Sequence, residues 1–152
     1  LPEYETFRNA FCNLGYSRKN ERFGEDEGNK SDIQYILLKY EQYLRGSNEP
    51  IPVFTIEHIR KDSLKDYTAK IGNLICLEEE YNNNLGSKRI NTKVPYYKIS
   101  IYESAKEAST FVTDEWSKKE IEERSIEISS KLYGNLWEQP AEKTTKLKLV
   151  SA

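Results

Sequence analysis

The spacing of apolar residues predicts helices toward both ends of the chain. Residues 2–14 carry an apolar side chain every three or four positions, and residues 33–44 repeat that spacing behind a Ser31-Asp32 N-cap. The intervening residues 17–30 are polar and contain glycine, which indicates an exposed loop. Beyond Gly86 the helical spacing returns, and Ser117 with Glu120 has the pattern of a capping box before a long final helix.

The period changes to two in the middle of the chain. Residues 53–59 (VFTIEHI) are β-branched and aromatic and alternate between two faces, which predicts a strand. A short helix is expected at residues 64–70, a second strand at 73–77 (NLICL), and a helix from Glu78, whose three acids complement the helix dipole. The predicted fold is α+β and mostly helical, with a hairpin-plus-helix unit clasped between helices.

The length of 152 residues fits one domain. We expect a helical lead-in at residues 1–47, a ββα core at about 50–90, C-terminal helices at about 95–138 and a loose tail at 139–152. Trp116 and Trp137 bracket the last helix and are expected to anchor the core. The chain contains no methionine, so we expect it to be cut from a longer protein.

Composition narrows the protein class. The sequence is 37% apolar and 32% charged, which is typical of a soluble globular domain, and its apolar runs are too short to span a bilayer. Cys12 and Cys76 form no CxxC pair, which excludes a structural zinc ribbon and favours two free thiols in a reducing, cytoplasmic compartment.

Charge is distributed unevenly along the chain. The formal net charge is −2, which argues against coating of nucleic acid by bulk charge. Residues 60–98 nevertheless hold eight basic and five acidic residues, a net charge of +3, and leave −5 for the rest of the chain. A locally basic middle in an acidic chain fits a focused binding site for a polyanion.

The one histidine of the chain lies in a chemically suggestive setting. His58 follows Glu57 on the first predicted strand, Asn73 begins the second strand, and Asn82 lies on the next helix. A neutral imidazole can take a proton from an attacking water. Glu57 and Asn82 offer hard oxygen ligands to Mg²⁺ or Mn²⁺, while Asn73 can brace the loop that aims His58.

These residues resemble the pattern of the HNH, or His-Me finger, nucleases. That pattern has an acid-His pair on the first strand, Asn-Leu at the second strand, and His or Asn nine residues after that Asn. Glu57-His58, Asn73-Leu74 and Asn82 match it as an HNN variant. The resemblance implies a ββα-metal core with one divalent ion. The zinc-binding cysteines of some HNH proteins are missing here, so no structural zinc is expected.

A wider resemblance extends to the C-terminal nuclease domain of GmrSD-type, modification-dependent restriction enzymes, over roughly residues 30–137. It is carried by Leu37-Leu38, Glu41, Ile56-Glu57-His58-Ile59, Ile71-Gly72-Asn73-Leu74, Leu77, Asn82, Gly86, Lys88, Lys93, Trp116, Ile121 and Arg124. Lys61 stands where the family usually has proline, which adds a candidate phosphate contact. The resemblance implies DNA cleavage in bacterial defence against phage, and a nucleotide-dependent, modification-sensing N-terminal domain in the parent protein.

Several alternatives stay open at this point. Lys61, Lys88, Lys93 and Arg124 are candidate contacts to the DNA backbone, with little sequence preference, or else ordinary solvated charges. Asn83 or Asn84 could replace Asn82 as the ligand, and Glu41 is expected to fix the core rather than act in catalysis. The domain as a whole could instead be a DNA-binding module without turnover, or a helical docking domain.

Overall fold

A computed structural model describes residues 2–25 and 29–134 and shows an α+β, mostly helical fold, as predicted. The expected loose tail at 139–152 and the expected core anchor Trp137 lie outside the described residues. The helices are α1 (Tyr4–Phe11), α2 (Asn29–Arg45), α3 (Glu79–Leu85), α4 (Ile90–Ile99), α5 (Glu103–Ser109) and α6 (Lys118–Leu132). The strands are β1 (Thr55–His58) and β2 (Leu74–Leu77), and 3-10 turns occupy η1 (Glu21–Phe23), η3 (Tyr67–Ala69) and η4 (Ile71–Asn73).

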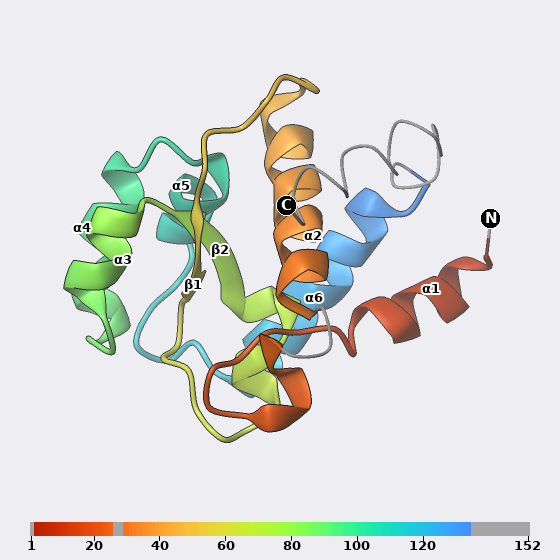
Figure 1. Cartoon of the computed structure of the whole chain (residues 1–152), viewed down its shortest axis with the longest axis horizontal. Coiled ribbons are helices and arrows are strands. Elements are labelled where there is room, and N and C mark those ends of the chain that lie inside the picture. Colours follow the sequence, from red (N-terminus) through yellow and green to blue (C-terminus); the bar gives the residue numbers. More distant parts are fainter. Residues whose placement is uncertain (1, 26–28, 135–152) are drawn as a thin grey trace.

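The two strands form an antiparallel hairpin at the centre of the molecule (Figure 1). Thr55 pairs with Leu77, and His58 pairs with Leu74. Every residue of β2 is buried because α2 and α5 pack against this strand. A two-stranded hairpin is marginal alone in water, so these helices supply the apolar contacts that it lacks.

Helices enclose the hairpin from two sides. Helices α3 and α4 lie together beside β1, and α6 packs on α1, α2 and η4 (Figure 1). Gly72 of η4 approaches α6 so closely that a Cβ would collide with the carbonyl oxygen of Ile121. Trp116 is buried in the core just before α6, which is where the sequence analysis expected an anchor.

Some predicted boundaries and caps are wrong. Helix α2 begins at Asn29, so Ser31 and Asp32 lie inside the helix rather than before it. The predicted capping box of α6 is absent because the side chain of Ser117 makes no capping hydrogen bond. The helix expected at residues 64–70 is reduced to the single turn η3.

Glu41 fixes the packing of α5 on α2, as expected from the sequence. Its carboxylate is fully buried and accepts hydrogen bonds from the backbone N–H groups of Glu103 (2.6 Å) and Ser104 (3.0 Å). These groups belong to the first turn of α5, whose N–H donors have no partner within the helix. The guanidinium of Arg45 pairs with the same carboxylate at 2.8 Å.

Candidate active site around His58

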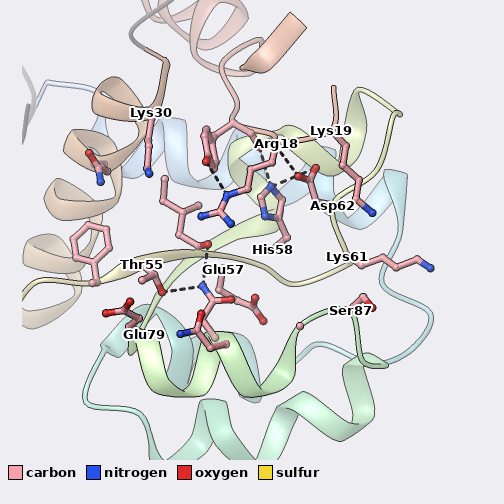
Figure 2. Close-up of a pocket in the computed structure, with 17 residues that line it drawn as sticks. Arg18, Lys19, Lys30, Thr55, Glu57, His58, Lys61, Asp62, Glu79 and Ser87 are labelled. Carbon is pink, nitrogen blue, oxygen red and sulfur yellow. Dashed lines mark hydrogen bonds and ion pairs between the residues drawn. The ribbon is translucent and has the colours of Figure 1, made fainter. Parts of the chain in front are cut away.

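A pocket of about 360 Å³ lies at the end of β1. Its floor is β1 itself, one wall is α3 with the following Gly86-Ser87, and the opposite wall comes from Tyr16, Arg18 and Lys19 together with Lys30 at the start of α2 (Figure 2). His58, Glu57 and Asn82 all line this pocket. The hairpin and the helix after it therefore bring together the three residues that the sequence analysis associated with metal and proton transfer.

His58 is held by one ring nitrogen. Its Nε2 lies 2.8 Å from the carbonyl oxygen of Tyr16 and 3.8 Å from Oδ1 of Asp62. A carbonyl oxygen only accepts, so Nε2 carries the proton, and Nδ1 keeps its lone pair in the neutral ring. Burial lowers the pKa of His58, while Asp62 acts in the opposite direction. Nδ1 has no hydrogen-bond partner among the residues described, which leaves a neutral nitrogen base in the pocket.

The Tyr16 carbonyl is placed by two attachments of its own segment. Gly15 and Lys70 form an isolated bridge, and the Tyr16 N–H donates to the Ala69 carbonyl at 2.9 Å. Gly15 is required there because a Cβ would collide with the same Ala69 carbonyl. On the other side, the Asp62 carboxylate accepts from the Ser17 hydroxyl at 2.6 Å.

Glu57 faces a different set of partners. Only 3% of this residue is exposed, and its Oε2 accepts a hydrogen bond from the Tyr97 hydroxyl at 2.6 Å and pairs with Lys93 Nζ at 3.2 Å. Burial raises the pKa of the Glu57 carboxyl, and the Lys93 ammonium acts to lower it. Both partners belong to α4, so this helix sets the position of the carboxylate.

Asn82 lines the pocket, and its side-chain amide is tied to β1. Its side-chain nitrogen donates to the Thr55 hydroxyl at 2.8 Å and to the Ile56 carbonyl at 3.1 Å, which fixes α3 against β1. The amide oxygen has no hydrogen-bond partner within residues 2–25 and 29–134. Asn83 also lines the pocket, whereas Asn84 does not.

The donor set fits a sparsely held hard cation. A carboxylate oxygen and an amide oxygen suit Mg²⁺ or Mn²⁺, which commonly keeps several waters and takes one or two protein ligands. In the part of the chain that the structure describes, no group of three or more His, Cys, Asp or Glu side chains is placed to hold a metal ion. Glu57 and Asn82 are the groups that would hold one here.

Asn73 is buried away from the pocket and ties the β1–β2 connection together. Its side-chain nitrogen donates to the carbonyls of Arg60 and Thr68, both at 2.8 Å. Its side-chain oxygen accepts from the Arg60 N–H at 2.9 Å and from Trp116 Nε1 at 3.2 Å. These bonds hold the loop that follows His58, which is the geometry of a brace and not of direct contact with substrate.

Two of the four predicted DNA contacts require correction. Lys93 is fully buried, and its ammonium donates to the carbonyls of His58 (2.8 Å) and Ile59 (3.2 Å). Arg124 is 4% exposed and donates to the carbonyls of Gly72 and Leu74. Neither side chain is available to a phosphate. Their charges serve the interior because they satisfy backbone carbonyls that would otherwise be buried without donors.

The other two predicted contacts are exposed. Lys61 lines the pocket, and Lys88 lies outside it, between α3 and α4. The sequence analysis missed the wall opposite α3, where Arg18, Lys19 and Lys30 face the pocket (Figure 2). The Arg18-Lys19 doublet is a weak signal, and only the fold brings residues 16–19 next to His58.

The model of one protein family, the C-terminal domain of GmrSD restriction endonucleases, matches residues 1–131. The chain belongs to this family. The match begins well before residue 30, so it also covers the segment that carries Tyr16 and Arg18. Searches of curated proteins and of solved structures gave no match.

Membership identifies this GmrSD C-terminal domain as a restriction-endonuclease-type domain, and the family implies nuclease activity on DNA within a multi-domain parent chain. Every residue of the His58 pocket lies inside the matched region. Among residues 2–25 and 29–134, no helix is both long and apolar enough to cross a membrane.

Proposed function

We propose that this domain is a divalent-metal-dependent, HNH-type DNA endonuclease and the cleavage domain of a modification-dependent defence protein. The observation that carries the proposal is the state of His58. Its Nε2 is engaged by the Tyr16 carbonyl, so Nδ1 is the basic nitrogen in a pocket shared with Glu57 and Asn82. Membership in a restriction endonuclease family supports the same activity.

The residues of the chain perform the proton transfer. His58 Nδ1 takes a proton from a water as the water oxygen forms a bond to phosphorus, and the bond from phosphorus to the leaving sugar oxygen breaks. The resulting imidazolium keeps its Nε2–H bond to Tyr16 and gains attraction to Asp62, 3.8 Å away. A bound Mg²⁺ or Mn²⁺ would relieve charge on the phosphate and the leaving oxygen as a Lewis acid.

Plasmid cleavage tests this function directly. Purified protein is incubated with supercoiled plasmid in Mg²⁺ or Mn²⁺, with and without EDTA, and nicked and linear products are separated on a gel. We expect cleavage that EDTA abolishes and that returned Mg²⁺ restores. Cleavage that persists in EDTA would reject the metal, and failure to cleave in either metal would reject the nuclease assignment for the isolated domain.

A second candidate function is DNA binding without turnover. The observation that favours it is the Lys93–Glu57 ion pair at 3.2 Å, because the ammonium already neutralises a carboxylate that a metal would use. This function predicts DNA binding that falls steeply with salt, through counterion release, but no metal-dependent nicking. The plasmid assay therefore separates the two.

Selection of modified DNA is proposed to lie elsewhere in the parent protein. The exposed cations at the pocket, such as Lys61, Lys19 and Lys30, suit phosphate contacts that carry no sequence information. We expect the isolated domain to cut modified and unmodified DNA of one sequence at similar rates and at scattered positions. Mapping the ends tests this, and cuts confined to one short motif would place the specificity inside this domain.

A further inference from the structure

Arg18, in the wall opposite α3, is held at two points. Its backbone N–H donates to Asp62 Oδ2 at 2.8 Å, and its side-chain Nε donates to the Tyr16 hydroxyl at 3.3 Å. Asp62 is the residue that also lies beside His58 Nε2. The same carboxylate therefore sets the position of the base and of the Arg18 backbone.

The anchor of Arg18 is itself rigid. Tyr16 is 2% exposed, and its hydroxyl donates to Glu25 Oε1 at 2.8 Å while it accepts from Arg18. Burial raises the pKa of this hydroxyl, so it stays protonated and continues to donate to Glu25. An arginine held at Nε loses less rotamer freedom when its terminal nitrogens bind a ligand.

The terminal nitrogens of Arg18 are left for a ligand. No hydrogen bond from them to any described residue is present, and Figure 2 shows the guanidinium over the pocket beside His58. Other arginines are already engaged, since Arg22 pairs with Asp66 at 2.7 Å and Arg124 donates to backbone carbonyls. A planar fork with free N–H donors matches the two non-bridging oxygens of a phosphodiester.

We propose that Arg18 binds the scissile phosphate itself, through its non-bridging oxygens, and so holds the phosphorus within reach of the water that His58 activates. The inference rests on the proposed nuclease function and adds a substrate contact from outside the hairpin-plus-helix unit. Lys61, on the loop after β1, would instead contact a flanking phosphate.

A pair of oligonucleotides separates scissile from flanking contacts. One duplex has ordinary linkages, and the other has one phosphodiester flanked by neutral methylphosphonates. Cleavage at that one linkage, resolved from cuts elsewhere on a sequencing gel, reports on a scissile phosphate without charged neighbours. Values of kcat/KM are measured for wild type, Arg18→Gln, Arg18→Lys and Lys61→Gln. Arg22→Gln is the matched control, because it removes the same charge from the same segment outside the pocket, and thermal melting checks that each variant is folded.

We expect Arg18→Gln to lower kcat/KM by roughly 10- to 100-fold on both duplexes, the range for a charge-assisted hydrogen bond, with Arg18→Lys in between. Lys61→Gln should be impaired only on the ordinary duplex, and Arg22→Gln on neither. The proposal is overturned if Arg18→Gln is impaired only on the ordinary duplex or no more than Arg22→Gln. It is also overturned if wild type cuts ordinary DNA but not the single-phosphate duplex.

Binding without turnover distinguishes this inference from the proposed function. If wild type cuts neither duplex, the nuclease assignment fails, and fluorescence anisotropy in EDTA then decides on Arg18. Weaker binding of both duplexes by Arg18→Gln, with Arg22→Gln like wild type, would support a contact to the central phosphate. Equal affinities for the two variants would overturn it. If Arg18→Gln does not fold, the same comparison is made with Arg18→Lys. Wild-type affinity of this variant would count against a contact made by the planar guanidinium.

Discussion

Glu57 and His58 are adjacent on β1, yet different parts of the molecule hold them. Helix α4 holds Glu57 through Lys93 and Tyr97 in a fully buried cluster. The N-terminal segment holds His58 through a backbone carbonyl, in a pocket open to ligands. On the α4 side, the ammonium of Lys93 is bound by the Glu57 carboxylate and by backbone carbonyls. On the N-terminal side, cations keep donors free, so position in the fold and not residue type decides whether a charge serves the core or a substrate.

The largest expected effect comes from removing the base on the N-terminal side. His58→Ala should lower the cleavage rate by about 10²- to 10⁴-fold, which is the usual contribution of a general base. DNA affinity and the thermal midpoint should stay near wild type, because the imidazole makes one hydrogen bond to the rest of the fold. Single-turnover cleavage and anisotropy are the measurements. A variant that cuts at the wild-type rate would show that another group is the base.

On the α4 side, substitution of Lys93 should lower the free energy of unfolding. Lys93→Ala removes the cation that pairs with the buried Glu57 carboxylate and the donor to the carbonyls of His58 and Ile59, and breaking a buried ion pair typically costs about 3–5 kcal/mol. Urea denaturation measures the loss in the free energy of unfolding. Lys88→Ala is the control, because this exposed lysine lies just before the same helix, and it should unfold like wild type. Equal stabilities for the two variants would contradict the inference that the charge of Lys93 stabilises the interior.

The sequence predicted those features that depend on a local pattern of residues, namely the hairpin and the residues that it carries to the pocket. The change from an apolar residue every three or four positions to strict alternation located the hairpin. Glu57 and His58 lie on its first strand and Asn82 on the helix that follows, and all three line one pocket, since a short hairpin followed by a helix allows few arrangements. The family resemblance was confirmed by the match over residues 1–131. The ββα-metal core, the metal itself and the roles of the site residues stay predictions.

Burial and long-range pairing were not readable from the sequence. Lys93 and Arg124 look like surface cations in the printed sequence, and only the packing of α4 and α6 shows them inside. The polar composition of residues 17–30 predicts a loop, and nothing in it indicates that Arg18, Lys19 and Lys30 line the pocket. The contact between Tyr16 and His58 spans 42 positions, and no local pattern encodes it.

The dependence of cleavage on Mg²⁺ concentration tests whether Asn82 of α3 and Glu57 hold the metal. Asn82→Ala should raise the Mg²⁺ concentration for half-maximal cleavage by roughly tenfold or more, because it removes an oxygen from a sparsely held ion. Glu57→Gln should shift the midpoint in the same direction while it preserves the shape of the buried side chain. Asn84→Ala is the matched control, since it lies on the same helix outside the pocket. Unchanged midpoints for both variants would move the metal to other residues, with Asn83→Ala tested next.

The smallest expected effect concerns Lys61, an exposed lysine at the pocket rim. If it contacts one flanking phosphate, Lys61→Ala should weaken DNA binding to a similar extent for all sequences and reduce the slope of log affinity against log salt by about 1. The fold should be unaffected, because no hydrogen bond or ion pair of its side chain to a described residue is present. Anisotropy titrations at several salt concentrations, on two unrelated duplexes, measure both quantities. A loss confined to one sequence would make Lys61 a reader of bases, and an unchanged slope would place it outside the DNA path. Either result would remove Lys61 from the set of phosphate contacts and leave the wall lined by Arg18, Lys19 and Lys30 as the substrate-facing side of this site.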